Sequence, residues 1–428
     1  MIDIHRHGFF VKLFSSAILM QALLSGANLI VGMLLIRHTT NAQYGYYVLV
    51  STAILLMTSI QNAYIQPSMV VKLTRAADDP QSRGDFVGSL HRDQVRLLPG
   101  LAAIAIAIAL TARLMNWIDT TLLWIVIAGA CAVTANLFRE FFRMVLLAYR
   151  RPGDVVRGDA LYVLVLIIGA VIAIQLPFAA AAMAGLLAVA AIVGGGYQRR
   201  SLRANEPWNP RAKSGALKSI YSVGVWAVIG AAIHWSFTQG YNYLVVGVLG
   251  VNDVAAIAAT RILMMPVNLV SSGVSTFMFP TVAGWLKQHR VPVVLKRIYL
   301  FTSGLVVLAL GYLLILWFMR DWIFTVVLRK HFEHRDELLI LWSVICITMV
   351  LRDQLAYTLI AHTRFRQLSA LAAVSAVIAL STSVIAMKLM GQPGALIGIL
   401  SGEGISVLGV LVMGWHDAKQ VSPVAKDA

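Results

Sequence analysis

Cysteine and charged residues are scarce in this sequence, and each scarcity excludes a class of protein. The 428 residues include two cysteines, Cys131 and Cys346, and both lie inside apolar runs, so neither a disulfide framework nor a zinc site is indicated. Only 13% of the residues are charged, whereas 59% are hydrophobic and the mean hydropathy is +0.78. A soluble domain of this length cannot bury so much apolar surface, so the composition predicts an all-α polytopic membrane protein.

Familiar motifs of catalysis and nucleotide binding are also missing. The sequence contains no P-loop, no GxGxxG, no GxSxG and no HExxH. The missing P-loop excludes an ATPase within this chain, though not an ATPase partner. We therefore expect no enzyme activity, no cofactor and no metal; coupling to H⁺ or Na⁺ stays open. His331–His334 is interpreted as a solvated loop, and Gly194–Gly196 as the end of an apolar helix.

Twelve apolar runs are long enough to span a membrane. They lie at about 14–36, 47–66, 97–115, 122–146, 160–175, 177–196, 222–249, 254–280, 298–319, 338–360, 367–389 and 394–415. A basic connector, Tyr197–Ser214, separates the sixth run from the seventh. The only long external connection, Arg320–Glu337, contains two apolar stretches that suit a short helix lying in the interface.

The orientation follows from the Lys and Arg residues in the connections. If the N-terminus is inside, the cytoplasmic connections hold 24 of these cations and the external ones hold 7. The net charge of +16 then indicates an anionic cytoplasmic leaflet as the partner, and not a nucleic acid. We expect a multi-pass protein of the bacterial cytoplasmic (inner) membrane with both termini in the cytoplasm.

The two halves of the chain share an internal repeat. Arg139-Glu140 lies near the end of one apolar run, and Arg352-Asp353 lies 213 residues later near the end of another. The same offset, within one residue, relates Asn28 to Asn242 and Pro67 to Pro280. This predicts two six-helix bundles, 1–210 and 211–428, related by an axis along the membrane normal, with the working site between them.

Ionisable residues inside the apolar runs are costly, and they mark either function or the packing of a bundle interior. Arg139 and Arg143 share one helix face with Glu140 beside them, which suits a salt-bridged gate, a packing pair or a basic surface for an anionic headgroup. Asp353 is the acid of the equivalent pair in the second half. Glu403 is a candidate for proton coupling, with a buried Arg partner as the alternative.

Arg261 is the most informative of these residues. It lies within the eighth run, five residues before Pro266, where a kink is expected, and no acid lies three or four residues away on its helix. It therefore needs cavity water, another helix or an anionic ligand. The seventh run contributes polar and aromatic candidates for cavity lining: His234, Trp235, Gln239, Tyr241 and Asn242. His234 is interpreted as a satisfied bundle histidine or a proton relay, and Asn28 and Asn242 as interhelical hydrogen-bonding residues or cavity lining.

Three stretches resemble the polysaccharide transporters and Wzx-type flippases of the multidrug/oligosaccharidyl-lipid/polysaccharide (MOP) exporter superfamily. They are LLIRHTTNAQYGYYVL (34–49), REFFRMVLLAYRRPGDVVRGD (139–159) and YNYLVVGVLGVNDVAAIAATRILMMPVNLV (241–270). The resemblance implies a V-shaped pair of bundles with alternating access and an undecaprenyl-diphosphate-linked oligosaccharide as cargo. A related lipid II flippase has cavity arginines on its first, second and eighth helices, and here only Arg261, on the eighth, matches.

The chemistry of such a cargo agrees with the residues present. Guanidinium groups, Arg261 and Arg352 among them, offer a diphosphate planar bidentate donors, and aromatic and amide side chains suit a sugar. The other classes considered are a cation-coupled drug antiporter, for which these runs contain few carboxylates, and a scaffold of a polysaccharide assembly complex, which needs no intramembrane arginines. Expected partners are the lipid-linked oligosaccharide, membrane lipids, and polysaccharide polymerase and chain-length machinery.

Overall fold

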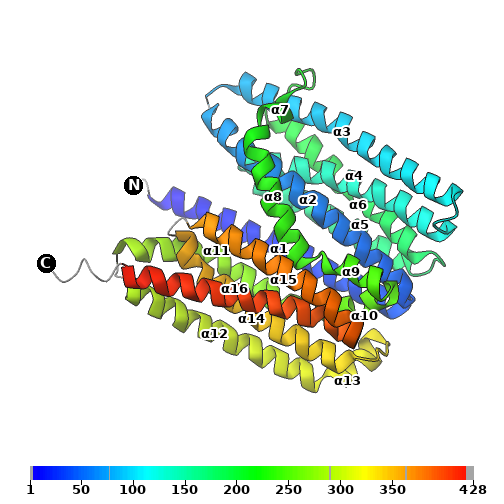
Figure 1. Ribbon diagram of the computed structural model, residues 1–428. Helices are drawn as coiled ribbons and strands as arrows, with labels where there is room; N and C mark the ends of the chain where they lie inside the picture. Colours follow the sequence, from blue (N-terminus) through cyan, green and yellow to red (C-terminus); the bar gives the residue numbers. More distant parts are fainter. Residues whose placement is uncertain (1–2, 77, 289–290, 362–363, 421–428) are drawn as a thin grey trace, which may run out of the picture. The chain divides into compact units, whose positions relative to one another are not determined.

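The computed structural model describes residues 3–76, 78–288, 291–361 and 364–420, which form helices and connections without strands (Figure 1). The chain divides into two compact units, Met1–Ala232 and Ile233–Ala428. The predicted connector lies within the first unit, and the division falls inside helix α8 (Tyr221–Thr238). The predicted boundary at residue 210 and the axis relating the repeats stay predictions.

The first unit is a bundle centred on α4. Its helices are α1 (Asp3–His38), α2 (Asn41–Arg75), α3 (Pro80–Leu114), α4 (Thr120–Ala148), α5 (Pro152–Ala173), α6 (Ala179–Asn205) and α7 (Ala216–Ser219). Side chains of Thr40, Asp79 and Asp119 accept backbone N–H groups at the starts of α2, α3 and α4, which explains where these helices begin. Helix α4 packs against α2, α3, α5 and α6, and α1 packs against α5.

The second unit repeats this order of neighbours. Its elements are α9 (Tyr241–Val248), α10 (Val251–Ile262), α11 (Met265–Gln288), α12 (Val291–Phe318), α13 (Arg320–Trp322), the π-helix η1 (Ile323–Leu328), α14 (Arg335–Ala361), α15 (Phe365–Met390) and α16 (Gln392–Gln420). Helix α14 packs against α10, α11, α12 and α16, as α4 packs against α2, α3 and α6. Arg139 lies on α4 and Arg352 on α14, so equivalent helices carry the two arginines, in agreement with a duplicated half.

By length and composition, the described residues contain ten helices that can cross a membrane, and the bent pair α10–α11 makes eleven. The bend of 53° follows Arg261 and confirms the kink expected at Pro266, whose ring removes a backbone donor. The seventh of the twelve predicted spans is the exception, because Gln239-Gly240 divides it into α8 and α9. Helical segments α13 and η1 confirm a short helix in the connection after α12. The chain termini lie outside the described residues.

The prediction that Gly194–Gly196 ends a helix is wrong, because α6 continues to Asn205. Two of these glycines, Gly194 and Gly195, instead allow close packing. A Cβ on Gly194 would lie 2.8 Å from the Gly158 carbonyl oxygen of α5, and one on Gly195 would lie 3.1 Å from the Arg139 backbone of α4. Helix α6 therefore continues through the glycines, because α4 and α5 pack into the space that larger side chains would occupy.

The connector is bound to one face of α3. The backbone N–H of Asn209 donates to the Gly84 carbonyl at 3.1 Å, and a Cβ on Gly88 would lie 1.8 Å from the backbone carbonyl oxygen of Asn209. Further along, the Asp93 carboxylate accepts the backbone N–H groups of Gly215 and Leu217, each at 2.9 Å. The predicted connector is thus a strap fixed within the first unit.

Candidate functional site

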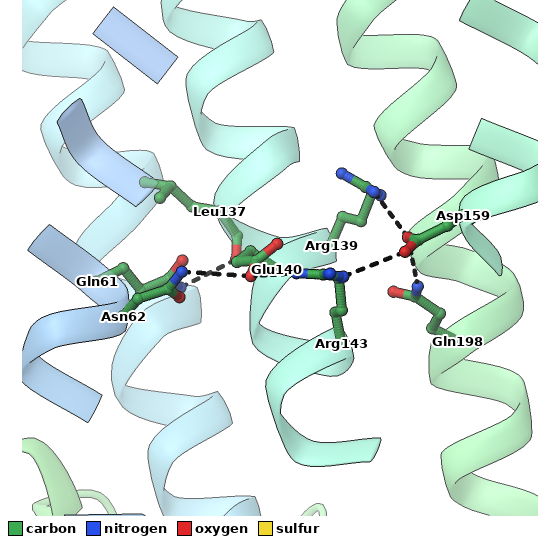
Figure 2. Close-up of polar contacts among 8 residues, drawn as sticks. All are labelled: Gln61, Asn62, Leu137, Arg139, Glu140, Arg143, Asp159 and Gln198. Atoms are coloured by element: carbon green, nitrogen blue, oxygen red, sulfur yellow. Dashed lines mark hydrogen bonds and ion pairs between the residues drawn. The ribbon is translucent and has the colours of Figure 1, made fainter. Parts of the chain in front are cut away.

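The first unit holds a largely buried cluster of four charges, three near the C-terminal end of α4 and one on α5 (Figure 2). Arg139 Nη2 donates to Asp159 Oδ1 at 2.7 Å, and Arg143 Nε donates to Asp159 Oδ2 at 3.2 Å. Arg143 also donates to Glu140 Oε1 at 3.0 Å. The Arg139 guanidinium lies 3.8 Å from the centre of the Tyr162 ring. Two cations and two anions cancel, so burial of this cluster is compensated inside the unit.

Amide side chains surround these charges on the neighbouring helices. Asn62 of α2 donates to Glu140 Oε1 at 3.3 Å, and Gln198 of α6 donates to Asp159 Oδ1 at 3.3 Å. Gln61 donates to both the Gln94 side chain and the Leu137 carbonyl. The cluster therefore links α2, α3, α4, α5 and α6, which supports the packing interpretation of Arg139, Glu140 and Arg143. Their role as a gate stays a prediction.

Asp159 is the member of this cluster that the sequence did not reveal as a site residue. It lies 20 residues after Arg139, beyond a turn, on the next helix. A signal was present, because Asp159 is the last residue of the stretch 139–159 and lies just beyond the short connection between two apolar helices, α4 and α5. An acid placed one hairpin away from an intramembrane Arg is a partner that helix spacing alone does not find.

The second unit contains the equivalent arginine with a different acid. Arg352 Nη1 donates to Glu403 Oε2 of α16 at 2.5 Å, and Arg352 Nε donates to Asp353 Oδ1 at 2.9 Å. The Glu403 side chain is only 2% exposed. Gly402 brings α16 close to α15, since a Cβ there would lie 2.7 Å from the Ala379 side chain. Glu403, a candidate for proton coupling, therefore has the buried Arg partner that was the alternative.

Arg261 differs from these arginines, because among the described residues no carboxylate lies within salt-bridge distance of it. Its Nη1 donates to Gln239 Oε1 at 2.8 Å and to the Tyr241 hydroxyl at 3.0 Å. Its guanidinium also lies 5.4 Å from the Trp342 ring centre and 5.8 Å from that of Tyr241. Neutral groups thus position Arg261 while leaving its positive charge unbalanced. Trp342 of α14 is a further residue that the sequence did not indicate.

Arg261 and Glu403 line one small cavity inside the second unit. Its wall is completed by Phe237, Thr238, Met264, Asn268, Trp342, Cys346, Met349 and Ile399. The cavity volume of about 30 Å³ has room for about one water molecule. A phosphate group would need this cavity to widen, and the apolar side chains of Phe237, Met349 and Ile399 are those that would have to move.

The remaining candidates of the seventh predicted span are less closely connected. Asn242 is buried and its side-chain amide donates to the Gln239 carbonyl at 3.0 Å, across the helix break, while its Oδ1 has no partner among the described residues. Trp235 packs against Tyr243, with the ring centres 5.7 Å apart and the ring planes tilted by 48°. His234 is exposed on α8, and Asn28 is exposed on α1 of the first unit. The structure thus brings Arg261, Gln239 and Tyr241 together and leaves the roles of the others as predictions.

The fold is shared with transporters of known structure, although no family model and no curated protein matches the sequence. An inward-facing multidrug resistance MATE family transporter of the MOP superfamily aligns with a TM-score of 0.73 at 13% identity, over 95% of this chain and 96% of that one. A MATE in the straight conformation aligns at 0.65 and 12% identity, over 96% of each chain. A MOP superfamily transporter from Pyrococcus furiosus aligns at 0.63 and 12%, again over 96% of each.

These alignments define the class of protein by its fold. The chain is a polytopic helical membrane protein with the fold of the MATE family transporters of the MOP superfamily. Identities of 12–13% say nothing about cargo, so the chemistry of the site must supply that part of the argument.

Proposed function

We propose that this protein translocates a polyprenyl-diphosphate-linked oligosaccharide across the cytoplasmic membrane by alternating access. The observation that carries the proposal is Arg261, an arginine inside an apolar span whose contacts are all neutral among the described residues. A charge at such a position costs several kcal/mol unless something compensates it. A diphosphate supplies that compensation and pairs with the planar guanidinium through two parallel hydrogen bonds.

The groups around Arg261 suit the rest of such a cargo. Gln239 and Tyr241 hold the guanidinium by one nitrogen, Nη1, which leaves its other donors for a ligand. The rings of Tyr241 and Trp342 are the kind of surface on which sugars stack, and the neighbouring amides can bind hydroxyl groups. Charge, planar donors and aromatic surface therefore lie together at one end of α10.

A drug or cation antiporter is less well supported by the same cavity. A cationic cargo needs a carboxylate, and the carboxylate that lines this cavity, Glu403, is already bound to Arg352 at 2.5 Å. The fold itself does not decide the matter. One of the structures that align is described by its authors as having a binding pocket of reversed polarity that suggests a different function, so this fold hosts sites of different charge.

The direct test replaces Arg261 and measures transport beside abundance. Arg261→Lys keeps the charge and loses the planar donors, so we expect transport to fall about tenfold. Arg261→Ala should abolish transport and leave membrane abundance normal, because no buried acid is left unpaired. Arg113→Ala, which removes a partly exposed cation at the end of α3, is the matched control. A fully active Arg261→Ala variant would contradict the proposal.

The cellular test identifies the cargo class. Deletion of the gene should cause lipid-linked oligosaccharide to accumulate on the cytoplasmic side while surface polysaccharide disappears. An unchanged surface glycan together with altered drug sensitivity would favour the antiporter instead. Loss of polymer with normal translocation of the lipid-linked unit would favour a scaffold.

A further inference from the structure

A second basic feature of the chain lies far in sequence from Arg261, at the turn between α2 and α3. A groove of about 480 Å³ is lined there by three cations, Lys72, Arg75 and Arg83, and by one acid, Asp79. The Asp79 carboxylate is engaged in capping α3, where it accepts the backbone N–H groups of Gln81 and Ser82 at 3.1 and 3.0 Å. The groove therefore has a net charge of +2 and lies entirely within the first unit.

The three cations are positioned without being neutralised. Among the described residues, no carboxylate lies within salt-bridge distance of any of them, in contrast to Arg139, Arg143 and Arg352. Lys72 Nζ donates to the neutral Ser219 hydroxyl at 2.8 Å and lies 4.7 Å from the Phe86 ring centre. Such contacts order the Lys72 side chain and keep its charge available.

Arg83 is held in the same way by an aromatic ring. Its guanidinium lies 4.5 Å from the centre of the Tyr149 ring, and its buried Nε has no acceptor among the residues that the structure describes. Burial raises the pKa of Tyr149 above its ordinary value, so this phenol stays neutral and offers Arg83 no negative charge. Arg83 is therefore a cation fixed against an aromatic ring, with its Nε available to an acceptor and no carboxylate partner among the described residues, which is an arrangement suited to an anion.

The position of the groove along α2 indicates what carries that anion. Val70 and Val71 precede the groove on α2 and are 44% and 48% exposed, so the apolar surface of this span continues to the edge of the cations. Leu73 and Phe86 supply an apolar wall inside the groove. A ligand with a phosphate head and hydrocarbon chains matches both surfaces, because the head meets the cations while the chains lie along α2.

We propose that the groove formed by Lys72, Arg75 and Arg83 is a binding site for the phosphate group of a lipid. Two sources share this chemistry, an anionic phospholipid of the membrane and the diphosphate head of a polyprenyl-linked cargo. In the second case the inference rests on the proposed function, with the groove receiving the head before it reaches the cavity of Arg261. The volume of the groove accommodates either head, whereas the Arg261 cavity has room for about one water molecule.

The test uses the full chain in phosphatidylcholine nanodiscs and measures lipid binding by native mass spectrometry. Phosphatidylglycerol and undecaprenyl diphosphate are titrated separately. The variant Lys72→Gln/Arg75→Gln/Arg83→Gln should weaken binding on the order of a hundredfold, since each cation near a membrane surface contributes about fivefold. The matched control, Arg200→Gln/Arg211→Gln/Lys213→Gln, removes three exposed cations outside the groove and should leave binding unchanged.

A second variant tests the sign of the effect. Asp79→Asn keeps the capping of α3, because asparagine is as good a cap, and removes the one carboxylate among the described residues that line the groove. It should tighten binding about fivefold. Since this variant strengthens binding, its expected result does not arise from misfolding.

The outcomes separate the sources as well as the two proposals. Loss of both lipids supports a common phosphate site, loss of phosphatidylglycerol alone supports a membrane lipid, and loss of the diphosphate alone supports a receiving site for cargo. Equal weakening by the control variant, no weakening by the triple variant, or weaker binding by Asp79→Asn overturns the inference. Arg261→Ala should retain lipid binding in the groove. The groove proposal can therefore be tested even if the proposed transport function is wrong.

Discussion

Removing Arg352 should destabilise the protein far more than neutralising its partner. Arg352→Met leaves the Glu403 side chain, 2% exposed, without the cation that compensates it. Breaking a buried ion pair in this way costs about 3–5 kcal/mol. Glu403→Gln keeps the size of the side chain and an acceptor oxygen, and Arg352 retains Asp353 at 2.9 Å. The cost is therefore the difference between a charged and a neutral acceptor in one hydrogen bond, about 1–2 kcal/mol.

A native cysteine provides the assay for this difference. Cys346 is buried on α14, six residues before Arg352, or about 9 Å of helix rise. In a Cys131→Ser background it is the single thiol, and a fluorogenic maleimide reports when heating exposes it. For a unit of this size, 3–5 kcal/mol corresponds to a fall in midpoint of roughly 6–20 °C, against a few degrees for Glu403→Gln.

The double variant Arg352→Met/Glu403→Gln is the decisive control. It removes both charges of the pair, so its midpoint should lie above that of Arg352→Met alone, because no unpaired acid remains at position 403. The reasoning is refuted if Arg352→Met is no less stable than Glu403→Gln, or if the double variant is the least stable of the three.

Three further predictions concern the first unit. Gly88→Val should displace the strap at Asn209, whose carbonyl oxygen would lie 1.8 Å from the new Cβ, and limited trypsin digestion should then cut the connector sooner than in the parent. Gly195→Leu should lower abundance in the membrane, whereas Gly196→Leu, beside which there is open space, should be neutral in the same blot. Asp159→Ala should cost about 3–5 kcal/mol because the buried Arg139 loses its acid and Arg143 keeps only Glu140, and thermal unfolding that matches the parent would contradict this.

Properties that depend on one helix at a time were predictable from the sequence. The length of the apolar runs predicted the spans. Pro266 predicted the bend after α10, because a proline lacks the backbone donor and so disturbs the helix locally. The lack of an acid near Arg261 on its own helix was also readable, and the structure adds none from the other described helices. The broken seventh span was not predicted, because the polar residues Gln239 and Asn242 were interpreted as cavity lining on one continuous helix and not as a helix break.

Properties that depend on contact between helices were not predictable. Asp159 and Glu403 form ion pairs with arginines that lie 20 and 51 residues away in the sequence. No helical spacing relates positions so far apart. The glycines at 194–196 were misinterpreted for the same reason, since an absent side chain indicates close packing only when the neighbour is known. Trp342 of α14 contacts Arg261 of α10, and no sequence pattern on either helix predicts this contact.

The positions of the two acids have a consequence for membrane insertion during synthesis. Asp159 follows Arg139 after 20 residues, so this arginine enters the bilayer almost together with its counter-charge. Glu403 follows Arg352 after 51 residues, which at 5–20 residues per second corresponds to roughly 3–10 s of translation. During that interval Asp353, the adjacent residue, is the acid already available to Arg352. The last helix is then the one that completes charge compensation of the second unit, and nascent chains arrested before α16 should be the ones that quality-control proteases remove.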